Sequence, residues 1–301
     1  MIGVRFQGRL GNQLFQYAFG ITLEKRLNTT FFVDDTIQQN YLNQYFTLRK
    51  FKIKYLVINY IFFKEIIKNL IKSKSFESFL NNYVRHNYLK EINRFPIIQQ
   101  AGGDIPLKWR KNIIDNALYV GFFQSSQYLI DLTDIRRHFT IKSKYRRQYE
   151  KRYKKIFNKY QTIVAHIRRT DYLDWGSDEL GGDNLTLPLE YYFNCMAEIV
   201  NIEQYKIFFI SDDIGYVKRN IKERQNFYFE SNDEIIDFQL LLNADVLILA
   251  NSSFSWWGAF LNSKENKKVY VPKNWLGFKS EKEYPIGIIE KSWKQIEINS
   301  N

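Results

Sequence analysis

The sequence is almost free of cysteine and histidine. Its 301 residues include one cysteine, Cys195, and three histidines. A single cysteine excludes an intramolecular disulfide and any zinc site built from several cysteines, and three histidines leave few ligands for a structural metal centre. We therefore expect a protein of a reducing compartment that holds no metal ion.

Long hydrophobic runs are also missing. The longest apolar stretches, 55–63 and 240–250, each contain an asparagine or aspartate and fall short of the ~20 residues that span a bilayer. Residues 1–15 lack the basic start, the apolar core and the cleavage site of a secretory signal. We expect a cytoplasmic protein, either free or held peripherally at the inner face of the membrane.

Negative charge is scarce, because 44 lysines and arginines outweigh 32 acidic residues. The formal net charge of +12 indicates an anionic partner, but it does not choose among nucleic acid, a phosphate-bearing small molecule and an acidic membrane surface. Nine basic residues lie within 50–90, and nine more accompany a single acid within 142–159. Tyrosine or phenylalanine recurs every fourth residue in the second stretch, which predicts one amphipathic helix.

The length allows two domains, because single cores stop growing near ~250–300 residues. Segments with strand and helix patterns alternate along the chain, which predicts an α/β protein with parallel sheets. The expected strands are 2–6, 31–33, 117–123, 162–166, 205–210, 245–250 and 269–271. The expected helices are 12–27, 124–130, 189–202 and 233–243, with a terminal amphipathic segment at 291–298.

Ligands of open parallel sheets bind at the carboxyl ends of the strands, so the residues that follow each strand are the candidates for a site. Arg168 and Arg169 directly follow the predicted strand 162–166. In an extended chain they point to opposite sides, so one would reach a bound phosphate while the other pairs with a carboxylate such as Asp171. The alternative is an ordinary surface pair in a basic chain.

A second candidate segment follows the predicted strand 245–250. Asn251 and three serines precede two consecutive tryptophans at a predicted helix N-terminus, where free backbone N–H groups and the helix dipole favour an anion. Simple N-capping needs only one such residue. Asp245 is a candidate acceptor for two N–H groups of a guanine edge, and its alternative role is that of a turn residue.

Five segments, in this order along the chain, resemble the bacterial α-1,2-fucosyltransferases of glycosyltransferase family 11. They are 8–18, 166–172, 187–192, 208–213 and 251–258. The resemblance implies a GT-B fold, in which two Rossmann-like domains face a central cleft. We expect an acceptor-binding domain over 1–158 and a GDP-fucose-binding domain over 159–301, with a terminal helix packing back on the first domain.

The resemblance also implies roles for individual residues. Arg168 would contact the β-phosphate, His166 the nucleoside and Asp245 the guanine. The other expected nucleotide-binding residues are Arg169, Ser211, Asp212, Asn251, Ser252, Ser253, Phe254 and Ser255. The loop expected to approach fucose and acceptor consists of Gly8, Arg9, Leu10, Gly11, Asn12 and Gln13.

The implied reaction is an inverting, metal-independent transfer of L-fucose from GDP-β-L-fucose to the 2-OH of a galactoside, which gives an α-1,2 linkage. The enzyme must then stabilise an oxocarbenium-like centre and a departing diphosphate. We expect Arg168, Asn12 and Asp171 to be catalytic, while the general base stays open. Its candidates by residue type are Asp34, Asp35, Asp171, Asp174 and Asp183. The expected partners are GDP-fucose and a galactose-containing oligosaccharide or lipid-linked glycan, with no cofactor.

Two other functions remain open at this point. Asp212 and Asp213 after a strand also fit the metal-binding pair of a GT-A glycosyltransferase, in which a divalent cation neutralises the diphosphate. The basic, tyrosine-rich composition fits a nucleic-acid-binding protein. The sequence contains no recognisable nucleic-acid module, however, so we expect no nucleic-acid partner.

Overall fold

The computed structural model describes residues 1–48, 92–109, 111, 113–129 and 132–298. The basic stretch 50–90 lies outside the described residues. Within them, no helix combines the length and the apolar character that crossing a membrane requires.

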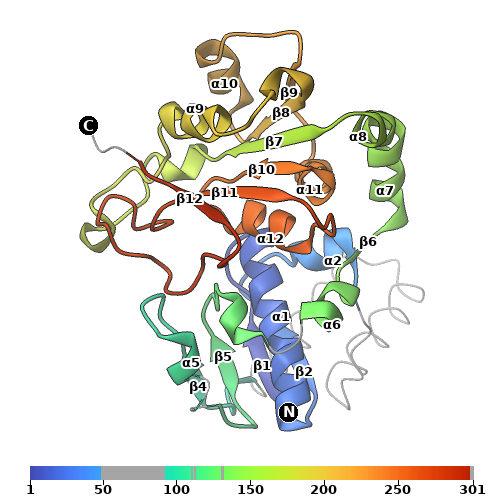
Figure 1. Cartoon of the computed structure of the whole chain (residues 1–301). Coiled ribbons are helices and arrows are strands. Elements are labelled where there is room, and N and C mark those ends of the chain that lie inside the picture. The colour runs from blue at the N-terminus through green and yellow to red at the C-terminus, as the bar shows by residue number, and fades with distance from the viewer. Residues whose placement is uncertain (49–91, 110, 112, 130–131, 299–301) are drawn as a thin grey trace, which may run out of the picture.

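The first half of the chain forms a four-stranded parallel sheet in the order β2-β1-β5-β4 (Figure 1). Its strands are β1 (Ile2–Arg5), β2 (Phe31–Asp34), β4 (Ile97–Gln99) and β5 (Leu118–Val120). Helix α1 (Leu10–Leu27) connects β1 to β2 and is buried over most of its first four turns. The strand–helix–strand unit predicted at the start of the chain is confirmed.

The second half forms a six-stranded sheet in the order β12-β11-β10-β7-β8-β9, with every pair parallel. The strands are β7 (Thr162–Ile167), β8 (Lys206–Ser211), β9 (Phe227–Glu230), β10 (Val246–Ile248), β11 (Lys268–Pro272) and β12 (Lys294–Ile296). This is the strand order of the Rossmann fold, and the winding reverses between β7 and β10. Ligands of such sheets bind beside the carboxyl ends of the strands at this reversal.

Helices cover both sheets and connect the two halves. They are α9 (Leu189–Ala197), α10 (Ile214–Asn220), α11 (Glu234–Asn243) and α12 (Ser253–Leu261) in the second half. The first half adds the short helices α2 (Tyr41–Tyr45), α5 (Pro106–Trp109) and α6 (Leu132–Arg137), and the antiparallel pair β3 (Phe46–Thr47) and β6 (Thr140–Ile141).

The two halves share one hydrophobic core. Helix α12 packs against α1, and the ring of Phe15 lies 4.4 Å from that of Trp256 and 5.0 Å from that of Trp257, measured between centroids. Both tryptophans are fully buried. The paired tryptophans therefore join the two domains through their apolar surfaces.

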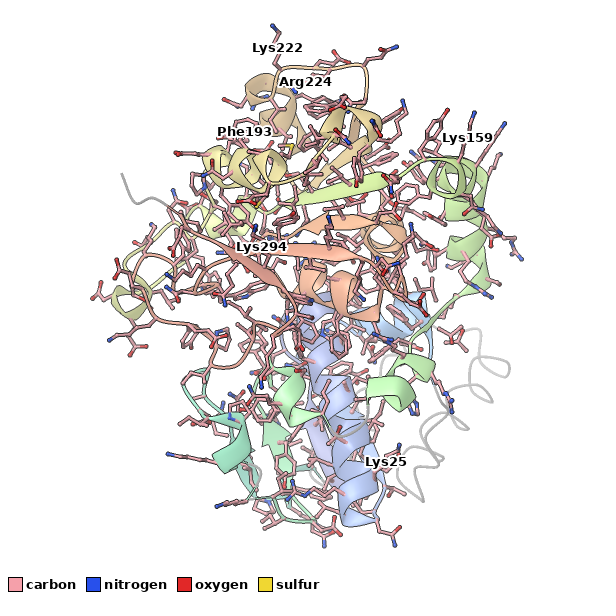
Figure 2. The ribbon with its side chains drawn as sticks, viewed as in Figure 1. Lys25, Lys159, Phe193, Lys222, Arg224 and Lys294 are labelled. Atoms are coloured by element: carbon pink, nitrogen blue, oxygen red, sulfur yellow. The ribbon has the colours of Figure 1, made fainter. Side chains whose placement is uncertain are left out.

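The helix predicted over 142–159 is confirmed as one continuous helical segment. It consists of α7 (Ser143–Tyr149), a π-helical turn (Glu150–Lys154) and α8 (Lys155–Lys159). Tyr149, Tyr153 and Phe157 are buried, whereas Lys159 projects outward from the end of α8 (Figure 2). The expected domain boundary at 158/159 falls in the last turn of α8 and stays a prediction.

Two expected helices are absent from the described residues. Only Ser126–Tyr128 forms a helical turn within the described part of 124–130. Ser125 caps its start by accepting from the N–H of Gln127, and the extended backbone of Leu129 ends it after one turn. The expected terminal helix is instead β12, which pairs with β11. The edge of β11 offers unpaired backbone groups, and a strand satisfies them where a helix would not.

Candidate active site

A cavity of about 1020 Å³ lies between the two domains. One wall comes from the segments after β1, β4 and β5, and the other from those after β7, β8, β9, β10 and β11. The second wall thus includes the reversal point of the six-stranded sheet, as the strand-end rule predicts. Pockets for a single small ligand measure ~300–1,000 Å³, so this cavity is as large as the largest of them.

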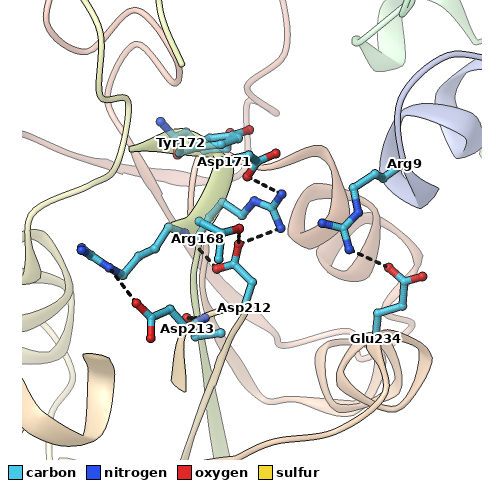
Figure 3. A network of polar contacts seen from close by, with 11 residues as sticks. Arg9, Arg168, Asp171, Tyr172, Asp212, Asp213 and Glu234 are labelled. Carbon is cyan, nitrogen blue, oxygen red and sulfur yellow. Dashed lines mark hydrogen bonds and ion pairs between the residues drawn. The ribbon is translucent and has the colours of Figure 1, made fainter. Parts of the chain in front are cut away.

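Arg168 supplies a fixed positive charge to this cavity. It follows β7, its side chain is only 13% exposed, and its guanidinium pairs with Asp212 at 3.0 Å and with Asp171 (Figure 3). Burial alone would lower the pKa of Arg168, but the two carboxylates outweigh burial and raise it. A guanidinium held in this way is suited to a diphosphate, because Asp212 fixes its position and charge before the ligand binds.

Asp212 orients Arg168. Its carboxylate also accepts hydrogen bonds from the backbone N–H of Arg169 at 2.9 Å and from the hydroxyl of Thr170. Burial would raise the pKa of Asp212, but the Thr170 bond and the charge of Arg168 lower it below the ordinary value. Asp212 is therefore a firmly ionised anchor.

Asp213 faces away from Asp212. It caps α10 by accepting from the N–H of Tyr216 at 3.0 Å and pairs with Arg169 at 3.7 Å. The GT-A alternative requires Asp212 and Asp213 to share a metal ion. Each carboxylate instead has its own arginine and backbone partners, and the fold is a pair of Rossmann-like domains, so the GT-A fold is wrong. Transfer without a metal ion stays a prediction.

His166 and Asn251 bring unsatisfied polar atoms to the cavity lining. His166 is 6% exposed, and burial holds its pKa well below the ordinary value despite the opposing charge of Asp212. Its imidazole is therefore neutral, and its Nδ1 has no hydrogen-bond partner. The Oδ1 of Asn251 is likewise buried without a partner. Because buried polar atoms are nearly always bonded, these two mark places for a polar ligand.

Asp237 is a site residue that the sequence pattern did not single out. It lies on α11, lines the cavity and accepts from Nδ2 of Asn232 at 2.9 Å. Burial, reinforced by the charge of Glu230, raises the pKa of Asp237 to about 8. The available signal was one carboxylate inside the otherwise apolar run of α11.

Asn12 connects the two walls of the cavity. Its Oδ1 accepts from Nε2 of Gln124 at 2.7 Å within its own domain and from Oγ of Ser253 at 2.8 Å in the other. The neighbouring Gly11 allows this approach, because a Cβ at that position would lie 2.4 Å from the backbone nitrogen of Phe254. The first helix of one domain therefore touches the first turn of α12 directly.

Arg9 also spans the cleft. Its guanidinium lies 3.9 Å from the carboxylate of Glu234 on α11 (Figure 3). Because the Arg9 side chain is more than half exposed, this pair contributes little to stability.

Most of the predicted site residues line the cavity. They are Gly8, Arg9, Leu10, Gly11, Asn12, His166, Arg168, Asp171, Ser211, Asp212, Asn251, Ser252, Ser253 and Phe254.

Arg169 does not line the cavity. The two adjacent arginines point to opposite sides, as predicted, but the expected partner of the second was wrong. Asp171 pairs with Arg168, whereas Arg169 faces Asp213 and stacks on the ring of Tyr216 at 3.3 Å. Arg169 is thus a structural residue of the wall behind the site.

Asp245 also lies elsewhere than the sequence predicted. It accepts from the N–H of Thr162 at 2.8 Å and pairs with Lys264 at 2.6 Å. Because Asp245 precedes β10, it lies at the amino ends of the strands, opposite the cavity. Asp245 does not line the cavity for this reason, and the geometry gives no support to the expected contact with guanine.

Ser255 and Gln13 have structural roles as well. The buried Ser255 hydroxyl donates to backbone carbonyls of its own turn. The Gln13 amide donates to the carbonyls of Gly8 at 3.2 Å and Gln39 at 2.7 Å. Both side chains fix the shape of a site loop, and neither lines the cavity.

Comparison with known proteins finds one family that matches almost the whole chain. Glycosyl transferase family 11 matches residues 1–297. The O-antigen biosynthesis glycosyltransferase WbnK of Escherichia coli is 27% identical, over 89% of this chain and 93% of the relative. The α-1,2-colitosyltransferase of Escherichia coli is 25% identical over 99% of both chains.

Among solved structures, POFUT1 in complex with GDP is similar, with a TM-score of 0.51, 13% identity and coverage of 90% of this chain and 97% of that chain. This likeness concerns the fold, which in both proteins is GT-B: two Rossmann-like domains that face a cleft. With nearly every residue matched by the family, the chain belongs to glycosyltransferase family 11.

Proposed function

We propose that this glycosyltransferase moves L-fucose from GDP-β-L-fucose to the 2-OH of a galactoside, with inversion and without a metal ion. The observation that carries the proposal is the placement of Arg168, a fixed cation at the reversal point of the six-stranded sheet. An α-1,2 linkage is supported by the name of the colitosyltransferase relative.

We assign the guanine to Asp237 in place of Asp245. A guanine edge presents adjacent N–H donors at N1 and N2, and one ionised carboxylate accepts from both. The Phe254 ring, 5.4 Å from the His166 ring and 5.5 Å from the Phe238 ring, adds an aromatic surface next to this acid. Neutral His166 and Asn251 supply the remaining hydrogen bonds to the nucleoside.

The diphosphate fits between Arg168 and the start of α12. Ser252 and Ser253 line the cavity at this helix N-terminus, where backbone N–H groups favour an anion. These contacts strengthen as negative charge develops on the leaving GDP, which is how a fixed cation accelerates transfer.

Asp171 is the best-placed general base. In the donor-free protein its carboxylate, 57% exposed, is held by Arg168. A diphosphate that binds Arg168 takes over this bond and frees Asp171 to accept the proton of the acceptor hydroxyl. Asp174 also lines the cavity, whereas Asp34 is buried against Arg5. Neither Asp34, Asp35 nor Asp183 lines the cavity.

The test is donor binding followed by transfer. Calorimetry with GDP, ADP and UDP should show binding of GDP alone, and NMR of the product from GDP-fucose and lactose should show an α-1,2 linkage in the presence of EDTA. GDP-colitose is the competing donor suggested by the relative. A preference for GDP-colitose would show that the donor sugar is colitose and not fucose. Absence of GDP binding would overturn the proposal.

We also propose a peripheral contact between the α7–α8 segment and an acidic membrane surface at the cytoplasmic face. The buried aromatic side turns the basic side outward. Its exposed basic residues are Lys144, Arg146, Arg147, Lys151, Arg152, Lys154, Lys155 and Lys159.

A further inference from the structure

Among the described aromatic side chains that line the cavity, two are highly exposed. Phe122 follows β5 and is 42% exposed, and Trp175, in the loop after β7, is 45% exposed. They belong to different domains, and neither is used by the donor contacts described above. Rings exposed inside a cavity are available to a ligand that covers them.

The backbone next to Phe122 holds its ring out of the core. Phe123 has a φ of +51°, a left-handed conformation that is unfavourable for a residue with a Cβ. The buried Gln100 accepts from the N–H of Phe122 at 3.1 Å and of Phe123 at 3.0 Å. The Phe123 ring stacks on Phe19, with centroids 3.9 Å apart. One ring thus anchors the turn, and the other is presented to the cavity.

Trp175 is adjacent to the phosphate-binding region. Its ring lies 5.0 Å from that of Tyr172, and the Arg168 guanidinium lies 5.5 Å from the same Tyr172 ring. A sugar stacked on Trp175 would therefore lie close to the fucose of a donor held by Arg168.

The surroundings of Phe122 are polar but almost uncharged. The lining residues of this wall include the amides of Asn12, Gln99 and Gln124. Amides donate to and accept from sugar hydroxyls, and an aromatic ring stacks on the C–H face of a pyranose. Arg9 is the one charged side chain among the described lining residues of the N-terminal domain, and it faces Glu234.

We propose that Phe122 and Trp175 form the acceptor subsite, and that this subsite takes a neutral, hexose-containing glycan. The inference rests on the proposed function, because it assigns to the second substrate the part of the cavity that GDP-fucose leaves open. It also narrows the acceptor class, since among the described residues of the N-terminal wall the only cation is Arg9, which faces Glu234.

The experiment compares Phe122→Ala and Trp175→Ala with the wild-type enzyme. Transfer from GDP-fucose is measured on lactose and on its anionic counterpart 3′-sialyllactose, and the GDP dissociation constant is measured by calorimetry. We expect each variant to raise the KM for lactose about tenfold or more while GDP affinity changes less than about twofold. Phe122→Tyr keeps the ring and should restore the KM.

Phe193→Ala is the matched control, because Phe193 is 43% exposed on α9 (Figure 2) and does not line the cavity. An unchanged lactose KM in both alanine variants would overturn the subsite, and so would preferred transfer to 3′-sialyllactose or the absence of transfer to lactose. If the same variants also lose GDP affinity, Phe122 and Trp175 belong to the donor site and the acceptor subsite is overturned. Failure of the wild-type enzyme to bind GDP would instead overturn the proposed function.

Discussion

The two walls of the cavity differ in their chemistry. The wall from the C-terminal domain carries the charges of Arg168 and Asp212 at the ends of β7 and β8, and the ionisable Asp237 on α11. In the part of the chain that the structure describes, the wall from the N-terminal domain carries glycines, amides and Phe122, and its one cation there, Arg9, is paired with Glu234. A charged wall suits a charged leaving group, and an uncharged wall suits a neutral sugar. If the proposed donor site is right, a few placed charges, and not the net charge of +12, define it.

The strongest test of this comparison contrasts two adjacent arginines. Arg168→Ala removes the charge that faces the diphosphate and should lower kcat about 10²–10³-fold. Arg169→Ala removes a guanidinium that stacks on Tyr216 outside the cavity and should mainly lower the melting temperature. Steady-state kinetics and thermal unfolding of both variants separate the two effects.

Arg168→Lys controls for the uncompensated charge that Arg168→Ala leaves on Asp212. It keeps the charge but not the two-pronged geometry, so it should retain more activity than the alanine variant. Equal losses of kcat in the Arg168 and Arg169 variants would contradict the division between a site residue and a structural one.

The next largest effect should come from Asp237→Asn. A charge-assisted hydrogen bond contributes ~1.5–3 kcal/mol, so its loss should weaken GDP binding by ~10–100-fold. Because the pKa of free Asp237 is about 8 and a guanine contact favours the ionised form, GDP binding at pH 7 should release a proton. GDP affinity should therefore rise with pH up to about 8. Calorimetry in buffers of different ionisation enthalpy measures this release.

The same variant should affect stability in the opposite direction. A raised pKa means that folded Asp237 keeps a proton that the unfolded chain has lost, so its contribution to stability falls as pH rises from 3.8 to about 8. Asp237→Asn removes this penalty and should raise the melting temperature at pH 8. Proton release that persists in the asparagine variant would exclude Asp237 as its source.

A third test disturbs the contact between the walls. Gly11→Ala places a Cβ 2.4 Å from the backbone of Phe254, and overpacking of this kind costs ~1–3 kcal/mol. We expect a lower melting temperature and a lower kcat together. Gly103→Ala is the control, because a Cβ there meets nothing within 4 Å. Full activity in Gly11→Ala would show that the close approach is dispensable.

The smallest effect concerns the basic helical segment. Arg147→Glu with Lys151→Glu should weaken binding to vesicles that contain phosphatidylglycerol, by about 1 kcal/mol per charge near the surface, and leave transfer to lactose unchanged. Lys222→Glu with Arg224→Glu makes the same charge change in the loop between α10 and β9, at the top of the view in Figure 2. If both pairs of substitutions weaken vesicle binding equally, the binding depends on the overall charge of the protein and not on the α7–α8 segment.

The sequence predicts the donor wall better than the acceptor wall, for a physical reason. His166 lies at the end of an apolar run and Arg168 and Ser252 follow such runs, and residues at the carboxyl ends of parallel strands gather at one edge. The same rule should have excluded Asp245, which precedes its strand. Phe122 follows β5 as well, but only the bonds of Gln100 decide that its ring points outward while that of Phe123 points inward.

Asp237 marks another limit of the sequence. A carboxylate within an apolar helix is as consistent with a surface stripe as with a buried site. Its burial depends on the packing of α11 between α12 and α7, which are contacts far apart along the chain. The terminal strand β12 similarly depends on β11 having a free edge, which a local pattern does not reveal.

The shared core sets a limit on how this enzyme can be re-engineered. Because Phe15 packs on both Trp256 and Trp257, the two domains are not interchangeable modules. A chimaera that takes its N-terminal domain from a relative would need a residue at the position of Phe15 that packs equally well on both tryptophans. New acceptors are therefore reached more directly by changing single side chains on the cavity wall than by exchanging the domain that carries it.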